Sequence, residues 1–217
     1  MQKKHKPARD KRTFWYSVAR ALGRVMRTFF FPVRYHHLER IDSACAPYIV
    51  MANHISMLDP VFIALAIKRY EVHFLGKREL GANILFRFFL NKLHTIFVSR
   101  HMSDMAAMRA CNEVLKKGGA LGLFPEGTRV PPEKLMQNVE SGLSLIALRN
   151  RVPVMPVYIH SPVRLFHATH VYFLPKLDYG DLAGNGVGKD VCDQLTQRFI
   201  DVLLEARSSA QRELSAR

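Results

Sequence analysis

The chain has 217 residues, of which 48% are hydrophobic, and 32 Lys and Arg against 18 Asp and Glu give it a net charge of +14. This length predicts one domain with a single core, and the hydrophobic content excludes a disordered chain. A surface this basic favours nucleic acid, anionic lipid headgroups or acidic carrier molecules as partners. Because no run reaches about 18 uninterrupted apolar residues, we expect no helix that spans a bilayer.

Residues 1–34 are predicted to form an N-terminal region with two parts. Residues 1–13 are a basic tail, for which we expect disorder that is compatible with binding to an anionic surface. Residues 14–30 predict an amphipathic helix that ends at Pro32. Its polar, basic stripe comprises Ser17, Arg20, Arg24, Arg27 and Thr28. Its apolar face comprises Phe14, Trp15, Val18, Leu22, Val25, Met26 and Phe29.

Three interpretations of this helix stay open. It could pack on the core, or it could lie in a membrane interface with its aromatic residues inserted and its Arg side chains at the headgroups. The third interpretation is a cleaved targeting sequence of the mitochondrial kind, which is rich in Arg and poor in acids. A secretory signal is disfavoured because arginines interrupt the apolar residues.

Residues 35–217 are predicted to form one α/β domain. Its predicted elements, in chain order, are a strand at 48–52, a helix at 60–70, strands at 72–75 and 95–98 on either side of a helix at 82–92, a helix at 103–117, a strand at 120–124, a helix at 137–150, strands at 152–159 and 171–174, and a helix at 189–206. This alternation predicts a mixed, largely parallel sheet flanked by helices. The prolines of the segment 152–157, among them Pro156, suit an edge strand or a sharp bend.

A His and an Asp follow the first predicted strand of this domain. Asn53 and His54 come directly after residues 48–52, and catalytic groups of open α/β sheets collect at such strand ends. Asp59 precedes Pro60, so that we expect Asp59 to open the next helix. A strand–turn–helix arrangement can fold His54 back onto Asp59, which leaves the second ring nitrogen basic and aimed at a substrate hydroxyl. The alternative is that Asp59 only caps its helix and that His54 fills a turn.

A second motif, Phe-Pro-Glu-Gly-Thr-Arg at residues 124–129, also follows a predicted strand. Gly127 permits backbone angles that other residues avoid, and it allows a ligand to approach closely. Arg129, which follows Thr128, offers a planar fork of donors that suits a phosphate. We expect Glu126 to order the loop by pairing with a cation or with backbone amides. The alternative is an ordinary turn with a solvated Arg.

Further cations lie at the ends of other predicted strands. Lys77 and Arg78 follow the strand at 72–75, and Arg100 closes the strand at 95–98. Lys77 or Arg78 could add charge at the phosphate site, and the alternative is that these residues and Arg100 are surface cations. The three cysteines show no Cys-x-x-Cys pattern, and the histidines show no ligand spacing, so that we expect reduced thiols and no metal site.

In four segments the sequence resembles the glycerolipid acyltransferases, a family that includes lysophosphatidic acid acyltransferase and glycerol-3-phosphate acyltransferase. The resemblance covers about residues 35–175, and its four blocks appear in the order 53–60, 76–100, 124–129 and 152–157. Two positions depart from the family pattern. Val130-Pro131-Pro132-Glu133 follow the third block where Ser and Gly are usual, and Ser99 precedes the Arg of the second block where Asp or Gly is frequent. These departures bear on the identity of the acceptor.

The resemblance implies that His54 is a general base, that Asp59 is its partner, and that Arg129 with Lys77 binds the phosphate of the acceptor. It implies an O-acyltransferase that uses acyl-CoA or an acyl carrier protein as donor, needs no cofactor, and acts on 1-acyl-glycerol-3-phosphate. It also implies a peripheral protein at the cytoplasmic face of the inner (plasma) membrane, docked through residues 14–30.

Alternative functions stay open beside this one. The acceptor could be glycerol-3-phosphate or another lysolipid or alcohol. A member that binds membranes and has lost activity is disfavoured by the intact motif residues. In another class, a basic nucleic-acid-binding protein agrees with the charge, but no recognisable nucleic-acid motif supports it.

Overall fold

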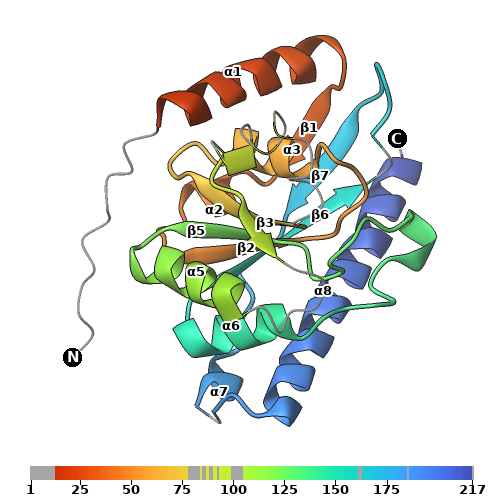
Figure 1. Cartoon of the computed structure of the whole chain (residues 1–217). Coiled ribbons are helices and arrows are strands. Elements are labelled where there is room, and N and C mark those ends of the chain that lie inside the picture. Colours follow the sequence, from red (N-terminus) through yellow and green to blue (C-terminus); the bar gives the residue numbers. More distant parts are fainter. Residues whose placement is uncertain are drawn as a thin grey trace.

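The computed structural model describes residues 13–77, 84, 87, 90, 91, 93–98, 105–160, 163–184 and 186–216. In this part of the chain, seven strands form one sheet in the order β1-β7-β6-β2-β5-β3-β4 (Figure 1). The strands are β1 Val33–His36, β2 Tyr48–Ala52, β3 Val72–Lys77, β4 Ile96–Val98, β5 Ala120–Leu123, β6 Val154–His160 and β7 Thr169–Phe173. Of these pairings only β6–β7 is antiparallel, which confirms the predicted mixed, largely parallel sheet.

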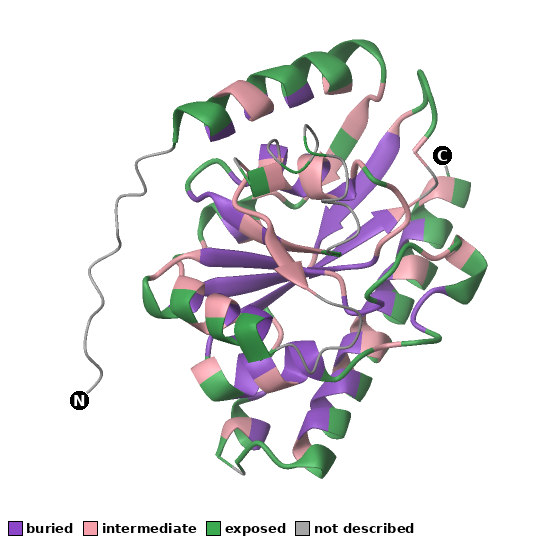
Figure 2. Ribbon diagram, viewed as in Figure 1, coloured by how far each residue is buried: buried purple, intermediate pink, exposed green. Residues whose placement is uncertain are grey.

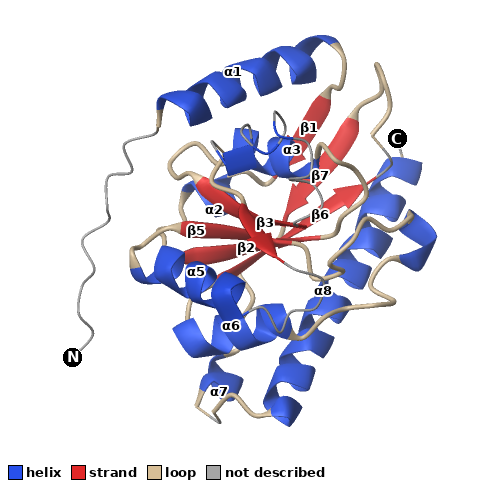
Figure 3. Cartoon of the chain, in the orientation of Figure 1, coloured by secondary structure: helices blue, strands red, loops and turns tan. Residues whose placement is uncertain are grey.

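Helices cover both faces of the sheet (Figure 3). They are α1 Phe14–Phe29, α2 Glu39–Asp42, α3 Asp59–Ala66, α5 Met105–Lys116, α6 Gly142–Asn150, α7 Gly180–Ala183 and α8 Lys189–Ser215, with a 3₁₀ turn at Pro132–Lys134. In β2, Ile49 and Met51 pack with α5, α6 and α8, whereas Tyr48, Val50 and Ala52 pack with α2 and α3. Because both faces are covered, the whole strand is buried, and this explains its uninterrupted apolar sequence (Figure 2).

The structure differs from the predicted elements mainly in their ends. The strand β1 was not predicted, and it spans the expected boundary between residues 34 and 35. Such a short strand at the sheet edge alternates polar and apolar residues too briefly to be recognised. The helices α2 and α7 were missed because each has only four residues. The helix α8 continues past residue 206 because Ala206 and Ala210 extend its buried stripe with small side chains.

Pro156 corrects the expectation of an edge strand. It lies in β6, which pairs with β2 on one side and with β7 on the other. The Leu174 amide donates to the Pro156 carbonyl over 2.9 Å, and the ladder continues from Val157 opposite Phe173. The N–H that proline lacks therefore falls at the end of the β6–β7 ladder, and beyond it the two segments meet again in a bridge between Val154 and Leu177.

The amphipathic helix α1 packs on α3 with its small and polar residues, not with its apolar face. Its buried residues are Tyr16, Arg20 and Gly23, and a Cβ atom on Gly23 would lie 3.0 Å from the Val61 side chain. The large apolar residues point outward, with Phe14 72%, Trp15 46%, Leu22 56%, Val25 51% and Phe29 65% exposed. Packing on the core and an outward apolar face thus occur together in one helix.

One of the three open interpretations placed the arginines of this helix at lipid headgroups, and Arg20 does not fit it, because this residue is only 5% exposed. Its guanidinium donates to carbonyl oxygens in the last turn of α3: to Ala64, to Leu65 over 3.1 Å and to Ile67 over 2.9 Å. The last carbonyls of a helix have no hydrogen-bond donor within the helix, and they carry partial negative charge. A guanidinium supplies the missing donors and a compensating positive charge. Arg20 thereby fastens α1 to the helix that begins at Asp59.

Replacing Arg20 with methionine is expected to lower the free energy of unfolding by about 2–3 kcal/mol, because buried carbonyls lose their charged donor. Urea denaturation measures this change. The matched control is Arg24→Met, which removes the same charge from an exposed position of the same helix and should change stability little. Equal stability of the two variants would contradict the anchoring role of Arg20.

Candidate active site

The predicted site residues lie at one edge of the sheet. The strands β2, β5 and β3 are neighbours and run parallel, so that their carboxyl ends lie together. His54 follows β2, the motif 124–129 follows β5, and Lys77 ends β3. The arrangement agrees with the rule that ligands of open α/β sheets bind outside the carboxyl ends of strands.

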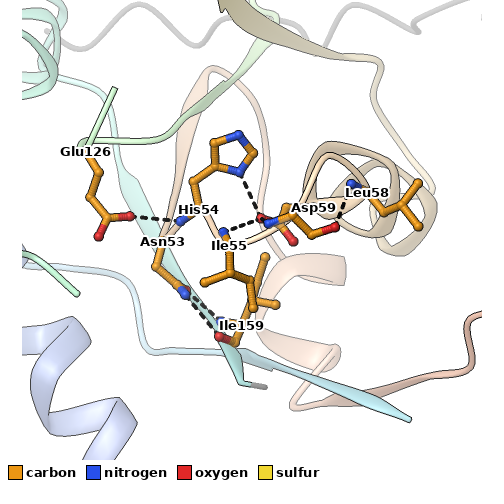
Figure 4. Close-up of polar contacts among 8 residues, drawn as sticks. Asn53, His54, Ile55, Leu58, Asp59, Glu126 and Ile159 are labelled. Carbon is orange, nitrogen blue, oxygen red and sulfur yellow. Dashed lines mark hydrogen bonds and ion pairs between the residues drawn. The ribbon is translucent and has the colours of Figure 1, made fainter. Parts of the chain in front are cut away.

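His54 and Asp59 form a hydrogen-bonded pair (Figure 4). The distance from His54 Nδ1 to Asp59 Oδ2 is 2.8 Å, and the same oxygen accepts from the Ile55 and Ser56 amides over 2.7 Å each. Asp59 is fully buried, whereas His54 is 16% exposed. The contact confirms the predicted strand–turn–helix geometry. The capping alternative is wrong, because Asp59 opens α3 after Leu58 and its carboxylate binds the preceding turn.

This pairing determines which nitrogen of His54 can act as a base. The Asp59 carboxylate only accepts, so that His54 Nδ1 carries the proton and Nε2 keeps its lone pair. No described residue forms a hydrogen bond with Nε2. The His54 ring stacks on Phe124 at 4.2 Å between centroids, and Phe124 stacks on Phe74 at 6.0 Å. Carboxylate and aromatic ring together hold the imidazole in one orientation. The role of Phe124 was not predicted, although it opens the second motif.

Glu126 joins the two motifs. Its Oε2 accepts from the His54 amide over 2.9 Å, and its Oε1 accepts from the Met136 amide over 3.0 Å. A third link is the Val130 amide, which donates to the His54 carbonyl over 2.9 Å. These contacts confirm the expectation that Glu126 binds backbone amides. Burial raises the pKa of the Glu126 carboxyl, and the two amide hydrogen bonds partly offset this rise.

Replacing Glu126 with glutamine is expected to break one of its two bridges, because an amide NH₂ cannot accept a hydrogen bond. The His54 loop should then shift, and a displacement of about 1 Å can cost up to about 10²-fold in turnover.

The folded pKa of Glu126 is raised, so its contribution to stability is present below the unfolded pKa and declines as pH rises through the folded pKa. Unfolding measured across pH in both proteins should show this decline in the wild type alone.

Asn53 holds the end of β2 against β6. Its side chain, 1% exposed, donates from Nδ2 to the Ile159 carbonyl over 3.0 Å and accepts at Oδ1 from the Ile159 amide over 2.7 Å. The side chain thus continues the ladder where the backbone of β2 turns away. Asn53 therefore positions the residue that follows it, His54.

The proposed phosphate-binding residues lie beside this pair. Gly127 has a φ of +60°, in the left-handed region, and a Cβ atom there would lie 3.0 Å from Glu140 Oε1, which confirms the need for glycine. Thr128 and Arg129 are exposed. The next residue, Val130, donates its amide to the His54 carbonyl. This hydrogen bond holds the loop that carries Arg129 close to His54.

The other predicted residues are placed less closely. Lys77 is exposed at the end of β3, and β5 separates that strand from β2. Arg100 and Arg78 lie outside the described residues. Pro156 lies within β6, opposite Met51 of β2.

Two properties of the described part of the chain concern ligands and membranes. None of its helices is long and apolar enough to cross a membrane. Nor does it contain a group of three or more His, Cys, Asp or Glu side chains that could hold a metal ion.

Known proteins that are similar to this chain in sequence include acyltransferases. The 1-acyl-sn-glycerol-3-phosphate acyltransferase of Streptococcus pneumoniae is 31% identical over 132 residues, 60% of this chain and 48% of that protein. The enzyme of the same name from Bacillus subtilis is 26% identical over 115 residues, 53% of this chain and 56% of that protein. The chain spans about half the length of these relatives.

A solved structure extends the likeness to the fold. The 1-acyl-sn-glycerophosphate acyltransferase of Thermotoga maritima has a TM-score of 0.69 and 25% identity, over 93% of this chain and 80% of that one. The family model for acyltransferases matches residues 32–160, more than half of the chain. The matched segment contains His54, Asp59 and the whole motif 124–129. The chain therefore belongs to the acyltransferase family.

Proposed function

We propose that this protein transfers a fatty acyl group from an acyl thioester to the free hydroxyl of 1-acyl-glycerol-3-phosphate, which yields phosphatidic acid. The observation that carries the proposal is the hydrogen bond between His54 Nδ1 and Asp59 Oδ2 at a strand end, with Arg129 exposed in the adjoining loop. Relatives that bear the name of this activity support it.

The pair can carry the reaction without an acyl-enzyme. His54 Nε2 takes the proton of the acceptor hydroxyl, and Asp59 stabilises the imidazolium that forms. The oxygen attacks the thioester carbonyl, and collapse of the tetrahedral intermediate breaks the carbon–sulfur bond. The proton on Nε2 then passes to the leaving thiolate, so that the products are an ester and a free thiol. Backbone amides near the strand ends are the proposed donors to the oxyanion.

The acceptor is proposed to bind through its phosphate. The Arg129 guanidinium can form paired hydrogen bonds with phosphate oxygens. Gly127 and Thr128 bring backbone close to the same position, and Lys77 adds positive charge at the same sheet edge. The donor is proposed to be acyl-CoA or an acyl carrier protein, and neither step needs a cofactor or a metal ion.

The protein is further proposed to lie on the cytoplasmic face of the inner membrane through α1. The support is the outward apolar face of this helix, with Phe14 and Phe29 among its most exposed residues, and the exposed Arg24. Interfacial helices combine such an apolar face with cations for anionic headgroups.

Thiol release from acyl-CoA, measured against a panel of acceptors, tests the proposed reaction. The panel contains 1-acyl-glycerol-3-phosphate, glycerol-3-phosphate, an uncharged lysolipid and a simple alcohol, each also offered with an acyl carrier protein as donor. We expect the first acceptor to give the highest kcat/KM. Preference for glycerol-3-phosphate or for an uncharged acceptor would replace the proposed substrate, and inactivity with every acceptor would contradict the reaction.

Co-sedimentation with vesicles of graded anionic content tests the membrane contact. Binding should rise with anionic lipid and fall with salt, because the cations are screened. The double variant Leu22→Ser, Phe29→Ser, which changes only exposed positions of α1, should bind less while it keeps its thermal stability. Equal binding of the variant and the wild type would contradict the role of α1.

A further inference from the structure

A second exposed apolar surface lies beside the C-terminal end of α1, on the connection between β6 and β7 (Figure 1). The described part of this connection, residues 163–168, carries Leu165 at 50% and Phe166 at 66% exposure. The Phe166 amide donates to the Phe30 carbonyl over 2.7 Å, and the two rings lie 6.4 Å apart. Phe30 itself is 46% exposed. The 163–168 loop and the end of α1 therefore form one continuous apolar surface.

The backbone of the 163–168 loop holds Phe166 outward. Phe166 has a φ of +60°, a region that a bulky side chain rarely adopts. The turn is closed by the His167 amide, which donates to the Arg164 carbonyl over 3.3 Å, and by a contact of 2.9 Å between His167 Nδ1 and the Leu165 carbonyl. In water, glycine or asparagine would fit this backbone better than phenylalanine. A large ring kept exposed at a strained position indicates a contact outside the chain.

The segments that carry this surface contain charges of one sign. Residues 13–38 and 161–177 contain no Asp or Glu. Their exposed cations include Arg24 on α1, Arg34 on β1 and Arg164 in the loop. Aromatic residues bordered by cations suit the interface of an anionic bilayer, where rings enter the headgroup region and arginines pair with phosphates.

The topology places the 163–168 loop at the edge of the sheet that carries the catalytic pair. The strands β6 and β2 run parallel, and the loop begins beyond the carboxyl end of β6 as His54 does beyond that of β2. The strand β7 returns antiparallel to β6, and β1 runs parallel to β7, so that the end of α1 reaches the same edge. A bilayer that touches both the loop and α1 would therefore face the edge at which His54 lies.

We propose that the 163–168 loop is a second membrane contact, which inserts Leu165 and Phe166 into the interface of an anionic phospholipid bilayer beside α1. The proposal rests on the membrane contact of α1 proposed above and adds a second point of attachment. A second contact beside the helix defines an orientation, whereas a single helix leaves the protein free to rotate about the helix axis. The orientation that they define turns the His54 edge toward the leaflet that holds a lipid acceptor.

Tryptophan fluorescence can test each contact separately, because Trp15 on α1 is the one tryptophan of the chain. The double variant Trp15→Phe, Phe166→Trp moves the probe to the loop. Its emission should be quenched by vesicles of anionic phospholipid with brominated acyl chains about as strongly as that of Trp15 in the wild type. The control is Trp15→Phe, Val187→Trp. Val187 is exposed and follows α7, a helix that lies at the opposite end of the molecule from α1 (Figure 1).

The three quenching results together test the loop contact and the α1 contact separately. Quenching of Trp15 without quenching at position 166 would overturn the second contact and leave the docking of α1 intact. Equal quenching at 166 and 187 would mean non-specific adsorption and would also overturn it. Absence of quenching at all three positions would contradict the membrane contact of α1 itself, and with it the present proposal.

The single variant Phe166→Asn separates membrane contact from packing. Asparagine tolerates a positive φ, so that thermal stability should stay equal or rise. Loss of the inserted ring should weaken partitioning into anionic vesicles about tenfold. Activity on a short-chain acceptor dissolved without membranes should stay unchanged. If the variant melts at a lower temperature and binds vesicles as the wild type does, Phe166 only packs on Phe30 and the proposal is wrong.

Discussion

Replacing His54 with alanine is expected to lower the rate of acyl transfer by about 10²–10⁴-fold, the usual contribution of a positioned base. The loss should fall on kcat, because Nε2 acts on the proton that moves in the transition state. Asp59→Asn should cost a comparable factor. An amide that turns its NH₂ group toward Nδ1 favours the wrong tautomer, and it removes the charge that stabilises the imidazolium. Steady-state rates of thiol release measure both effects.

Stability measurements keep this test independent of folding. The His54 side chain is partly exposed, and after its removal Asp59 keeps the Ile55 and Ser56 amides as donors, so that His54→Ala should melt near the wild-type temperature. Asp59 is fully buried and binds two amides besides His54, so that some loss of stability is expected in its variant. The control is His37→Asn, which changes an exposed histidine with a φ of +60° that asparagine tolerates. A folded His54→Ala protein with normal turnover would contradict its role as the base.

Replacing Arg129 with alanine is expected to raise KM for a phosphorylated acceptor by about 10- to 100-fold, the value of a charge-assisted hydrogen bond to phosphate. The KM for acyl-CoA should change much less, because the guanidinium is assigned to the acceptor. Initial rates with each substrate varied in turn measure the two constants.

The matched control for this charge change is Arg149→Ala. Arg149 is exposed near the end of α6, which leads into the amino end of β6, so that it lies at the opposite edge of the sheet from His54. The variant Arg149→Ala removes the same charge from the protein as Arg129→Ala does. An equal rise in KM in the two variants would therefore indicate only a general electrostatic attraction of the acceptor. If Lys77 binds the same phosphate, the double variant Lys77→Ala, Arg129→Ala should cost less than the sum of the single changes.

Local chemistry was sufficient to predict the contact between His54 and Asp59 and the elements that carry these two residues. His54 and Asp59 are five residues apart, and Pro60 determines where the next helix starts, so that their contact follows from one turn. The positive φ of Gly127 is likewise a property of its own backbone. Continuous apolar strands that alternate with helices indicate a parallel sheet, because both faces of each strand must be covered.

Contacts between distant segments were decided by the tertiary structure alone. Phe124 lies under the His54 ring, and Glu126 bridges the amides of His54 and Met136, because β5 pairs beside β2. Pro156 is accepted inside the sheet because the ladder between β6 and β7 begins at the next residue, Val157. No spacing along the chain encodes these neighbours, since each depends on the order in which the strands pair.

The helix α1 shows most clearly which properties follow from the sequence and which depend on the tertiary structure. Its sequence predicted an amphipathic helix with a basic stripe, and the structure confirms the helix. Whether an arginine of that stripe meets water, a headgroup or another helix cannot be read from periodicity, because all three environments accept the same charge. The tertiary structure decided that Arg20 binds the carbonyl end of α3, whereas Arg24, one turn further along, stays exposed. Burial of Arg20 is stable because those carbonyls have no other donor within their helix.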